Sequence, residues 1–282
     1  MEPTLDVARA PALSGRVLWT AAVVITLAAA VWQRRTGPSY PYHTTVVLGG
    51  QPSRLALPRS QVTTSGAPVT VAAPAAVQGT LYWRRYPTPD AFAPLPLREA
   101  GGTLGAVLPA EPAAGKVQYY LELGPPGAAV RVPRAGAVVL RYRGPVPAAI
   151  LLPHILLMFL GLLFGTRAGL GALVNERGHH KLALHTLAAY TLGGLCLGPI
   201  VQKFAFGAYW TGVPFGWDLT DNKTLLMWIG WAIAALVLAF HRQAARRLVL
   251  LAAVVTLVVY VVPHSAQGSE LDYSTLPAQP RD

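Results

Sequence analysis

The segment Gly207–Trp231, GAYWTGVPFGWDLTDNKTLLMWIGW, decides how the rest of the chain is interpreted, and it holds four of the seven tryptophans. Its first part, as far as Trp217, is aromatic and broken by glycine and proline, which predicts a loop. After Asp218 the sequence becomes almost wholly apolar, which predicts a membrane-spanning helix. Trp and Tyr favour the headgroup layer because the ring is apolar while the N–H or O–H stays hydrated. We therefore expect Tyr209, Trp210 and Trp217 to lie along a membrane interface.

Two acids mark the expected start of that helix. Asp218 and Asp221 are three residues apart and resemble a capping box, in which side chains satisfy the free N–H groups of the first turn. Together with Lys223 they also suit an ion or proton entry site. No acid lies deep inside an apolar run to continue such a path, so we favour the cap.

Composition places the chain in a membrane. Of its 282 residues, 53% are apolar and only 12% charged, whereas about a quarter are charged in soluble domains. Five apolar runs are long enough to span a bilayer, the last with help from flanking basic residues. They are Val17–Trp32, Pro147–Gly165, Leu182–Val201, Thr224–Phe240 and Leu248–Val262. The predicted fold class is a membrane α-helical bundle of about five transmembrane helices with an inserted extracytoplasmic all-β sandwich domain.

The first run has two interpretations. Arg9 and Arg16 precede it and Ala28-Ala29-Ala30 resembles a cleavage site, which is typical of a signal peptide. An uncleaved signal anchor is the alternative that we expect.

Basic residues in short loops predict the orientation, because such loops remain in the cytoplasm. The loops 166–181 and 241–247 are both rich in Lys and Arg. The aromatic loop, the segment after the first run and the C-terminus then lie on the periplasmic side of an inner membrane. Arg34 and Arg35 argue mildly against this orientation.

Between His43 and Arg143 the pattern changes to short β-prone pieces separated by Pro and Gly about every ten residues. Seven to nine strands over this length predict a two-sheet β-sandwich. Leu108-Pro109 followed by Ala114–Leu121, with Tyr119 and Tyr120, resembles the turn into a late strand of fibronectin type III or immunoglobulin-like domains, where a tyrosine locks the corner. The resemblance implies a recognition or spacer module and no catalytic residues.

This segment carries most of the net charge. Residues 33–144 have twelve Lys and Arg against four Asp and Glu, a net charge of +8 out of +11 for the chain. A basic outer domain suits docking to a soluble acidic protein, such as a cytochrome, or to anionic lipids; a soluble, self-repelling surface is the alternative. Nucleic acid is not expected there. The single cysteine, Cys196, excludes a disulfide framework.

The predicted domains are an N-terminal signal anchor at 1–35, a periplasmic immunoglobulin-like sandwich at 36–145 and a four-helix transmembrane bundle at 146–263, with the Trp-rich outer loop at 202–223. The tail, 264–282, is polar and without periodicity, so alone it should be disordered.

Glycine pairs predict helix contacts. Gly161 with Gly165 and Gly194 with Gly198 each form G-x-x-x-G, a spacing that lets helix backbones approach closely in lipid. The pattern suits packing between two spans of this chain or against a partner's helices.

Histidines in or near the spans form two candidate pairs for a b-type heme iron. His154 and His264 lie toward the outer face, and His185 and His241 lie toward the cytoplasm. Ordinary hydrated histidines at helix ends are the alternative.

Gly216-Trp217-Asp218 before Thr224 and Leu225 resembles the tryptophan-rich W-x-W-D segment of the heme-handling membrane proteins of cytochrome c biogenesis. The resemblance covers 207–231, and Phe215 stands where the motif has its preceding tryptophan. It implies that Trp217, Asp218, His154 and His264 present heme.

No nucleotide loop, metal-spaced cluster or nucleophile grouping is evident, so we expect a protein that is not an enzyme and holds no metal. The predicted function is that of an accessory or assembly subunit of a larger respiratory or photosynthetic membrane complex, in contact with lipids and other membrane subunits. Heme handling or electron transfer through heme b is the alternative.

Overall fold

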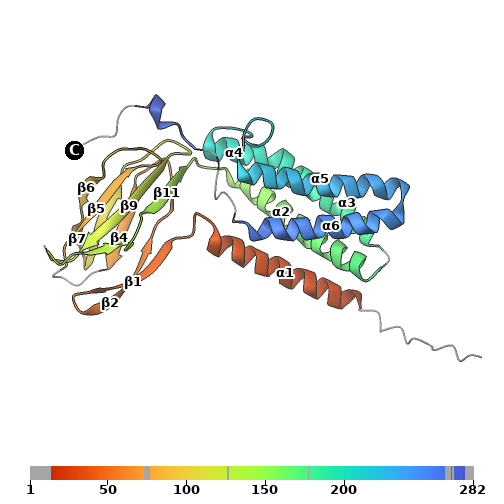
Figure 1. Ribbon diagram of the computed structural model, residues 1–282, viewed down its shortest axis with the longest axis horizontal. Helices are drawn as coiled ribbons and strands as arrows, with labels where there is room; N and C mark the ends of the chain where they lie inside the picture. The colour runs from red at the N-terminus through yellow and green to blue at the C-terminus, as the bar shows by residue number, and fades with distance from the viewer. Residues whose placement is uncertain are drawn as a thin grey trace, which may run out of the picture. The chain divides into compact units, whose positions relative to one another are not determined.

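The computed structural model describes residues 14–72, 77–125, 127–176, 178–263, 268 and 270–276. The chain forms two compact units (Figure 1). The helical unit contains the segment up to Trp32 together with His154–Leu195 and Lys223–Val262. The second unit contains Gln33–Pro153, Cys196–Asn222 and the tail from Pro263.

Within the described residues, five helices are long and apolar enough to cross a membrane, as the hydropathy pattern predicts. They are α1 (Gly15–Thr36), α2 (Ala148–Leu173), the continuous helix His179–Phe206, α5 (Leu219–Phe240) and α6 (Arg242–Val261). The third consists of α3 (His179–Tyr190), a π-helical stretch (Thr191–Leu197) and α4 (Gly198–Phe206).

Small residues bring the helices of the helical unit together. A Cβ at Gly161 would lie within 3.0 Å of the Tyr190 ring of α3, and one at Gly165 would lie 2.9 Å from Trp231 of α5. A Cβ at Gly194 would lie 2.7 Å from the Thr224 side chain. Gly198 is half-buried at the start of α4. Three of the four predicted glycines therefore let helices of this chain approach each other.

Polar contacts fix the register of these helices. The Trp231 indole donates to Thr256 of α6 at 2.9 Å, and the Tyr260 hydroxyl donates to the Met158 carbonyl of α2 at 3.0 Å. Arg246 donates to the carbonyls of Ala172 and Leu173, so it caps the C-terminal end of α2.

The prediction of a long basic loop at 166–181 is wrong, because α2 continues to Leu173. Arg167 lies inside that helix, 4% exposed, and its two terminal nitrogens meet the Glu176 carboxylate at 2.6 and 2.8 Å. The Trp19 ring of α1 lies 5.4 Å from the same guanidinium. Because Glu176 pairs with it, the Arg167 side chain can be buried in α2, beyond Gly165 where the apolar run predicted the end of the helix. Likewise, 241–247 is not a loop: only His241 separates α5 from α6.

The β-domain, defined here as residues 42–143, contains eleven described strands in three sheets. The strands are β1 (Tyr42–Leu48), β2 (Gln51–Leu57), β3 (Ser60–Val62), β4 (Ala67–Ala72), β5 (Gly79–Arg85), β6 (Ala93–Pro96), β7 (Arg98–Ala100), β8 (Thr103–Leu108), β9 (Lys116–Leu123), β10 (Val130–Val132) and β11 (Val138–Arg143). The six-stranded sheet has the order β3-β11-β9-β5-β6, with β10 also paired to β9. β1 pairs with β2, and β4-β8-β7 form the third sheet.

Alternation of buried and exposed residues, clearest in β4 and β9, turns one face of each strand inward. Buried residues of all three sheets form one hydrophobic core; it includes Leu48, Leu57, Val69, Leu81, Leu108 and Leu121. Each fully buried leucine contributes about 1.5–3 kcal/mol. The predicted all-β domain is confirmed, and its core forms without disulfides.

The contact that Tyr119 makes differs from the one expected for a tyrosine corner. The Tyr119 hydroxyl donates to the Pro58 carbonyl at 2.7 Å, which links β9 to the β2–β3 connection rather than to its own preceding turn. Tyr142 makes a similar long-range bond to the Pro109 carbonyl at 2.6 Å.

Candidate functional site

The aromatic loop, residues 207–218, connects α4 to α5 in the second unit (Figure 1). α4 ends because Gly207 adopts φ of +89°, a conformation that suits glycine, and its N–H donates to the Lys203 carbonyl. Both ends of the loop are thus fixed by helix termini.

Asp218 starts α5 as predicted. Its carboxylate accepts from the N–H of Thr220 at 2.8 Å and from that of Asp221 at 3.4 Å. These bonds satisfy free donors of the first turn. The second contact of a capping box, from the N–H of Asp218 to the side chain of Asp221, does not form. That N–H donates to the Thr211 carbonyl instead, so this part of the prediction is wrong.

Asp221 instead holds the loop. Its Oδ2 accepts from the backbone N–H groups of Thr211 at 2.6 Å and Gly212 at 3.0 Å. Asn222 accepts from the Val213 N–H at 2.7 Å, and Gln202 of α4 donates to the Thr211 hydroxyl at 2.7 Å. We call this set the Asp221 clamp. It ties the loop to α4 on one side and to α5 on the other.

Two glycines make this fold of the loop possible. A Cβ at Gly212 would lie 2.6 Å from the Asp221 Cβ, and a Cβ at Gly216 would overlap the Thr211 carbonyl. The amides of Phe215 and Gly216 both donate to the Gly212 carbonyl, which closes a tight turn.

The clamped loop turns apolar side chains outward. Trp217 is 86% exposed, Phe215 81% and Tyr209 60%. Trp210, by contrast, is half-buried and donates its indole N–H to the Val213 carbonyl. Sequence reasoning therefore missed Phe215, whose only signal was its place between Pro214 and Gly216 at the turn.

A second feature of this unit centres on Arg141 of β11, which is 9% exposed. Its guanidinium lies 4.2 Å from the Phe206 ring centroid of α4 and donates to the Gly268 carbonyl of the tail. Burial lowers the pKa of Arg141, and the carboxylates of Asp218 and Glu270 oppose that shift. Arg141 thus joins the strand, the helix end and the tail.

The tail is ordered where the structure describes it, so the prediction of disorder is wrong for Gly268 and 270–276. The Tyr273 hydroxyl accepts from the Lys116 N–H and donates to the Lys116 carbonyl, both at 2.8 Å. Glu270 pairs with the Lys116 ammonium. Arg85 lies 5.1 Å from the Tyr273 ring centroid and pairs with the buried Glu111 at 2.9 Å. Burial raises the pKa of the Tyr273 phenol above its ordinary value.

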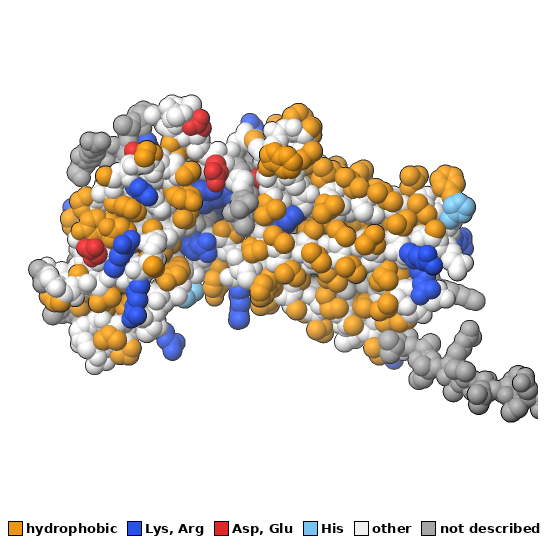
Figure 2. Space-filling model, in the orientation of Figure 1, with side chains coloured by type: hydrophobic (Ala, Val, Ile, Leu, Met, Phe, Trp, Pro, Cys, Tyr) orange, Lys and Arg blue, Asp and Glu red, His pale blue; other side chains and the backbone are white. Residues whose placement is uncertain are grey.

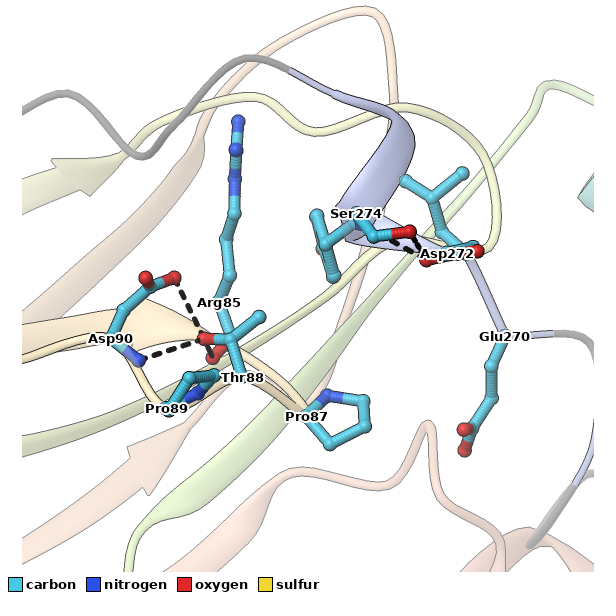
Figure 3. A pocket seen from close by; sticks show the side chains of 10 residues that line it. Arg85, Pro87, Thr88, Pro89, Asp90, Glu270, Asp272 and Ser274 are labelled. Carbon is cyan, nitrogen blue, oxygen red and sulfur yellow. Dashed lines mark hydrogen bonds between the residues drawn. The ribbon is translucent and has the colours of Figure 1, made fainter.

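An open pocket of about 540 Å³ lies between the tail and the β5–β6 turn. Figure 3 shows Arg85 extending between Thr88 and Asp90 on one side and Asp272 and Ser274 on the other. Thr88 donates to Asp90, and Ser274 donates to Asp272. These four polar side chains therefore pair locally within the pocket.

The outer face of the six-stranded sheet carries an aromatic and arginine patch. Tyr82 and Tyr120 are directly paired across β5 and β9, and their rings stack at 5.0 Å. Phe92 meets Tyr120 edge-on at 5.0 Å. Arg131 lies 4.0 Å from the Tyr120 ring centroid, and Arg84 lies 4.6 Å from that of Phe92.

Exposed charge on the β-domain is almost entirely positive. Glu99 is its one exposed acid, whereas five arginines are exposed: Arg54, Arg98, Arg131, Arg134 and Arg143. Figure 2 shows Lys and Arg side chains spread over this part of the surface. Among the described residues of the β-domain, ion pairs engage Arg85 and Lys116 and leave Arg131 and Arg134 without a carboxylate partner.

The predicted heme residues occupy different environments. The Nδ1 of half-buried His154 lies 2.9 Å from the Gly193 carbonyl, which requires an N–H at Nδ1 and leaves the Nε2 lone pair available. Trp217 points outward and Asp218 caps α5. His264 lies outside the described residues. His185 is exposed, with Nδ1 2.7 Å from the Lys181 carbonyl, and His241 is exposed between α5 and α6.

No group of three or more His, Cys, Asp or Glu side chains able to hold a metal ion occurs within the described part of the chain. Comparisons with protein-family models, with curated proteins and with solved structures find no match to this chain.

Proposed function

We propose that this chain is a non-enzymatic accessory or assembly subunit of a larger membrane complex, of the respiratory or photosynthetic kind, in a bacterial-type inner membrane. The five apolar helices pack in the bilayer and against partner subunits. The basic β-domain is an immunoglobulin-like recognition module. It docks a soluble acidic protein such as a cytochrome. The β-domain and the tail lie on the periplasmic side.

The helices support the membrane placement through their surfaces. Large apolar side chains are exposed along them, among them Leu27, Leu152, Leu236 and Leu251 at 59–63%. Figure 2 shows hydrophobic side chains over most of the face of the helical unit that it displays. Contiguous apolar surface of this extent is costly in water and suits lipid or partner helices.

The observation that carries the docking proposal is the imbalance of exposed charge on the β-domain, with five exposed arginines against one exposed acid. The stacked rings hold Arg131 in place, which reduces the entropy lost when a carboxylate binds. Tyr and Arg are also the residues enriched at binding hot spots.

Purification of the full chain in mild detergent, followed by native mass analysis, tests the proposal. We expect an acidic partner that dissociates with salt and is lost from the double variant Arg131→Glu, Arg134→Glu. The matched control is Arg54→Glu, an exposed arginine of the β1–β2 sheet. A lone monomer under these conditions contradicts the proposal.

Heme handling or heme b electron transfer is the second candidate, favoured by one observation. A backbone carbonyl orients His154 through Nδ1, the arrangement by which proteins commonly fix a metal-ligating imidazole. A Soret band in the purified protein that is lost in His154→Ala and retained in His185→Ala would establish it. A featureless visible spectrum would exclude bound heme in that preparation.

A further inference from the structure

We infer that the aromatic loop is a preformed lipid anchor, which holds Phe215 and Trp217 in the headgroup layer of the bilayer. This inference rests on the membrane placement proposed above and goes beyond the docking role. It commits to phospholipid headgroups as the occupant of this surface.

The first argument is exposure. Trp217 and Phe215 are the two most exposed large hydrophobic residues of the described chain, at 86% and 81%. Tyr209 and Val213 add to the same loop surface at 60% and 41%. Apolar side chains that project this far cost free energy in water unless another phase or molecule covers them.

The second argument is rigidity. The Asp221 clamp and the turn at Gly212 hold the loop backbone in the conformation in which Phe215 and Trp217 point outward. A loop that remains exposed in a fixed conformation is prepared to meet a surface without an ordering cost.

The third argument is charge. The two acids of this segment, Asp218 and Asp221, are each 7% exposed and accept hydrogen bonds from the loop and the helix. Within residues 203–222, the one exposed charged side chain is that of Lys203, whose ammonium lies 5.4 Å from the Tyr209 ring. Exposed aromatic rings with one exposed cation and no exposed carboxylate in this segment suit phosphate headgroups rather than an acid-binding or basic partner.

The fourth argument is continuity. α4 ends the membrane-length helix His179–Phe206, and α5 begins at Leu219. Both neighbours of the loop are therefore ends of helices that are long enough to cross the bilayer. If those helices span it, a short loop between them lies at the boundary where Trp and Tyr are enriched.

Site-specific labelling of the full chain tests the inference. A Cys196→Ser background removes the single native cysteine, and single cysteines are placed as Phe215→Cys and Trp217→Cys. Leu236→Cys, exposed on α5, is the lipid control, and Val107→Cys, exposed on β8, is the water control. Each carries an environment-sensitive fluorophore and is reconstituted into vesicles of phosphatidylcholine and phosphatidylglycerol.

Three quenchers then report depth: iodide in water, a spin label on the headgroup and a spin label in the middle of the acyl chain. We expect the headgroup label to quench positions 215 and 217 most strongly. Position 236 should respond most to the acyl-chain label, and position 107 to iodide alone. A second measurement uses the native tryptophans. The part of the fluorescence that disappears in Trp217→Phe comes from Trp217, and the headgroup label should quench it. The part that disappears in Trp83→Phe should not be quenched by that label.

The outcomes separate the two proposals. If positions 215 and 217 behave like 107 while 236 is in lipid, the protein spans the membrane but the anchor is wrong. Strongest quenching by the acyl-chain label would also overturn it, as would shielding from iodide without any lipid quenching, which would indicate a protein contact. If position 236 itself is quenched by iodide, the membrane placement fails.

Discussion

The carboxylate of Asp221 in α5 lies 2.6 Å from the backbone nitrogen of Thr211, ten residues earlier in the chain. One side chain in the first turn of a helix therefore determines the conformation of the loop that precedes it. The same carboxylate also accepts from Gly212, so two backbone donors, one of them buried, depend on it.

Replacement of Asp221 tests that dependence. Asp221→Ala leaves the amides of Thr211 and Gly212 without acceptors, and we expect a loss of about 1–3 kcal/mol in local stability. Asp221→Asn keeps one side-chain oxygen and should lose less. Hydrogen exchange of residues 209–217 is the measurement, with the amides of α6 as an internal reference; unchanged protection in the Ala variant would refute the clamp.

Arg141 should be sensitive even to a change to lysine. Its planar guanidinium stacks on Phe206 and reaches the Gly268 carbonyl, and an ammonium cannot do both. Because Asp218 and Glu270 would lose a buried cation in Arg141→Met, we expect a loss of about 3 kcal/mol for that variant and a smaller loss for Arg141→Lys. Denaturant titration of the purified protein checks this, with exposed Arg143→Met as the control expected to be near neutral.

Tyr273→Phe should release the tail. The variant removes one hydroxyl that accepts from the Lys116 N–H and donates to the Lys116 carbonyl, at a cost of about 1–2 kcal/mol. Limited proteolysis should then cleave the tail faster than in wild type. Ser274→Ala, which affects only a local bond to Asp272, should leave the cleavage rate unchanged; equal rates for all three proteins would contradict the proposed attachment.

The pair between Arg167 and Glu176 should make stability depend on acid. Hydrogen bonds from Arg167 lower the pKa of the Glu176 carboxyl. A group with a lowered folded-state pKa stabilises the fold above its unfolded pKa, and this contribution disappears as pH falls through the folded value. We expect wild type to lose stability in that acidic range, with Glu176→Gln lacking this component. Titration with denaturant at several pH values below neutrality measures it, and an identical pH profile for both proteins would refute it.

The sequence predicted the elements that depend on local pattern. The apolar runs located five helices, and Pro and Gly spacing located the strands, because both signals arise within a few residues. It also identified Asp218 as a cap, since a cap acts on the turn that follows it. Arg167 was misplaced in a loop because its partner, Glu176, lies beyond the end of the helix.

Features that depend on distant contacts were not predictable. Asp221 was assigned to a capping box, but its partners are Thr211 and Gly212, which only the folded loop brings near. The place of Phe215 between Pro214 and Gly216 did not predict its exposure, because a phenylalanine is ordinarily buried and its exposure follows from the clamp. The tail looked disordered because Tyr273 and Glu270 find their partner, Lys116, far away in the chain.

That last contact has a consequence for how the protein is made. Tyr273 and Lys116 are 157 residues apart, and four of the five long helices lie between them in the sequence. During synthesis, the strand that carries Lys116 emerges long before its hydroxyl partner, so the contact between the tail and the start of β9 forms only after the last helix has been produced. A chain whose translation stops early would lack this contact, and the Lys116 ammonium would lose Glu270 as its partner.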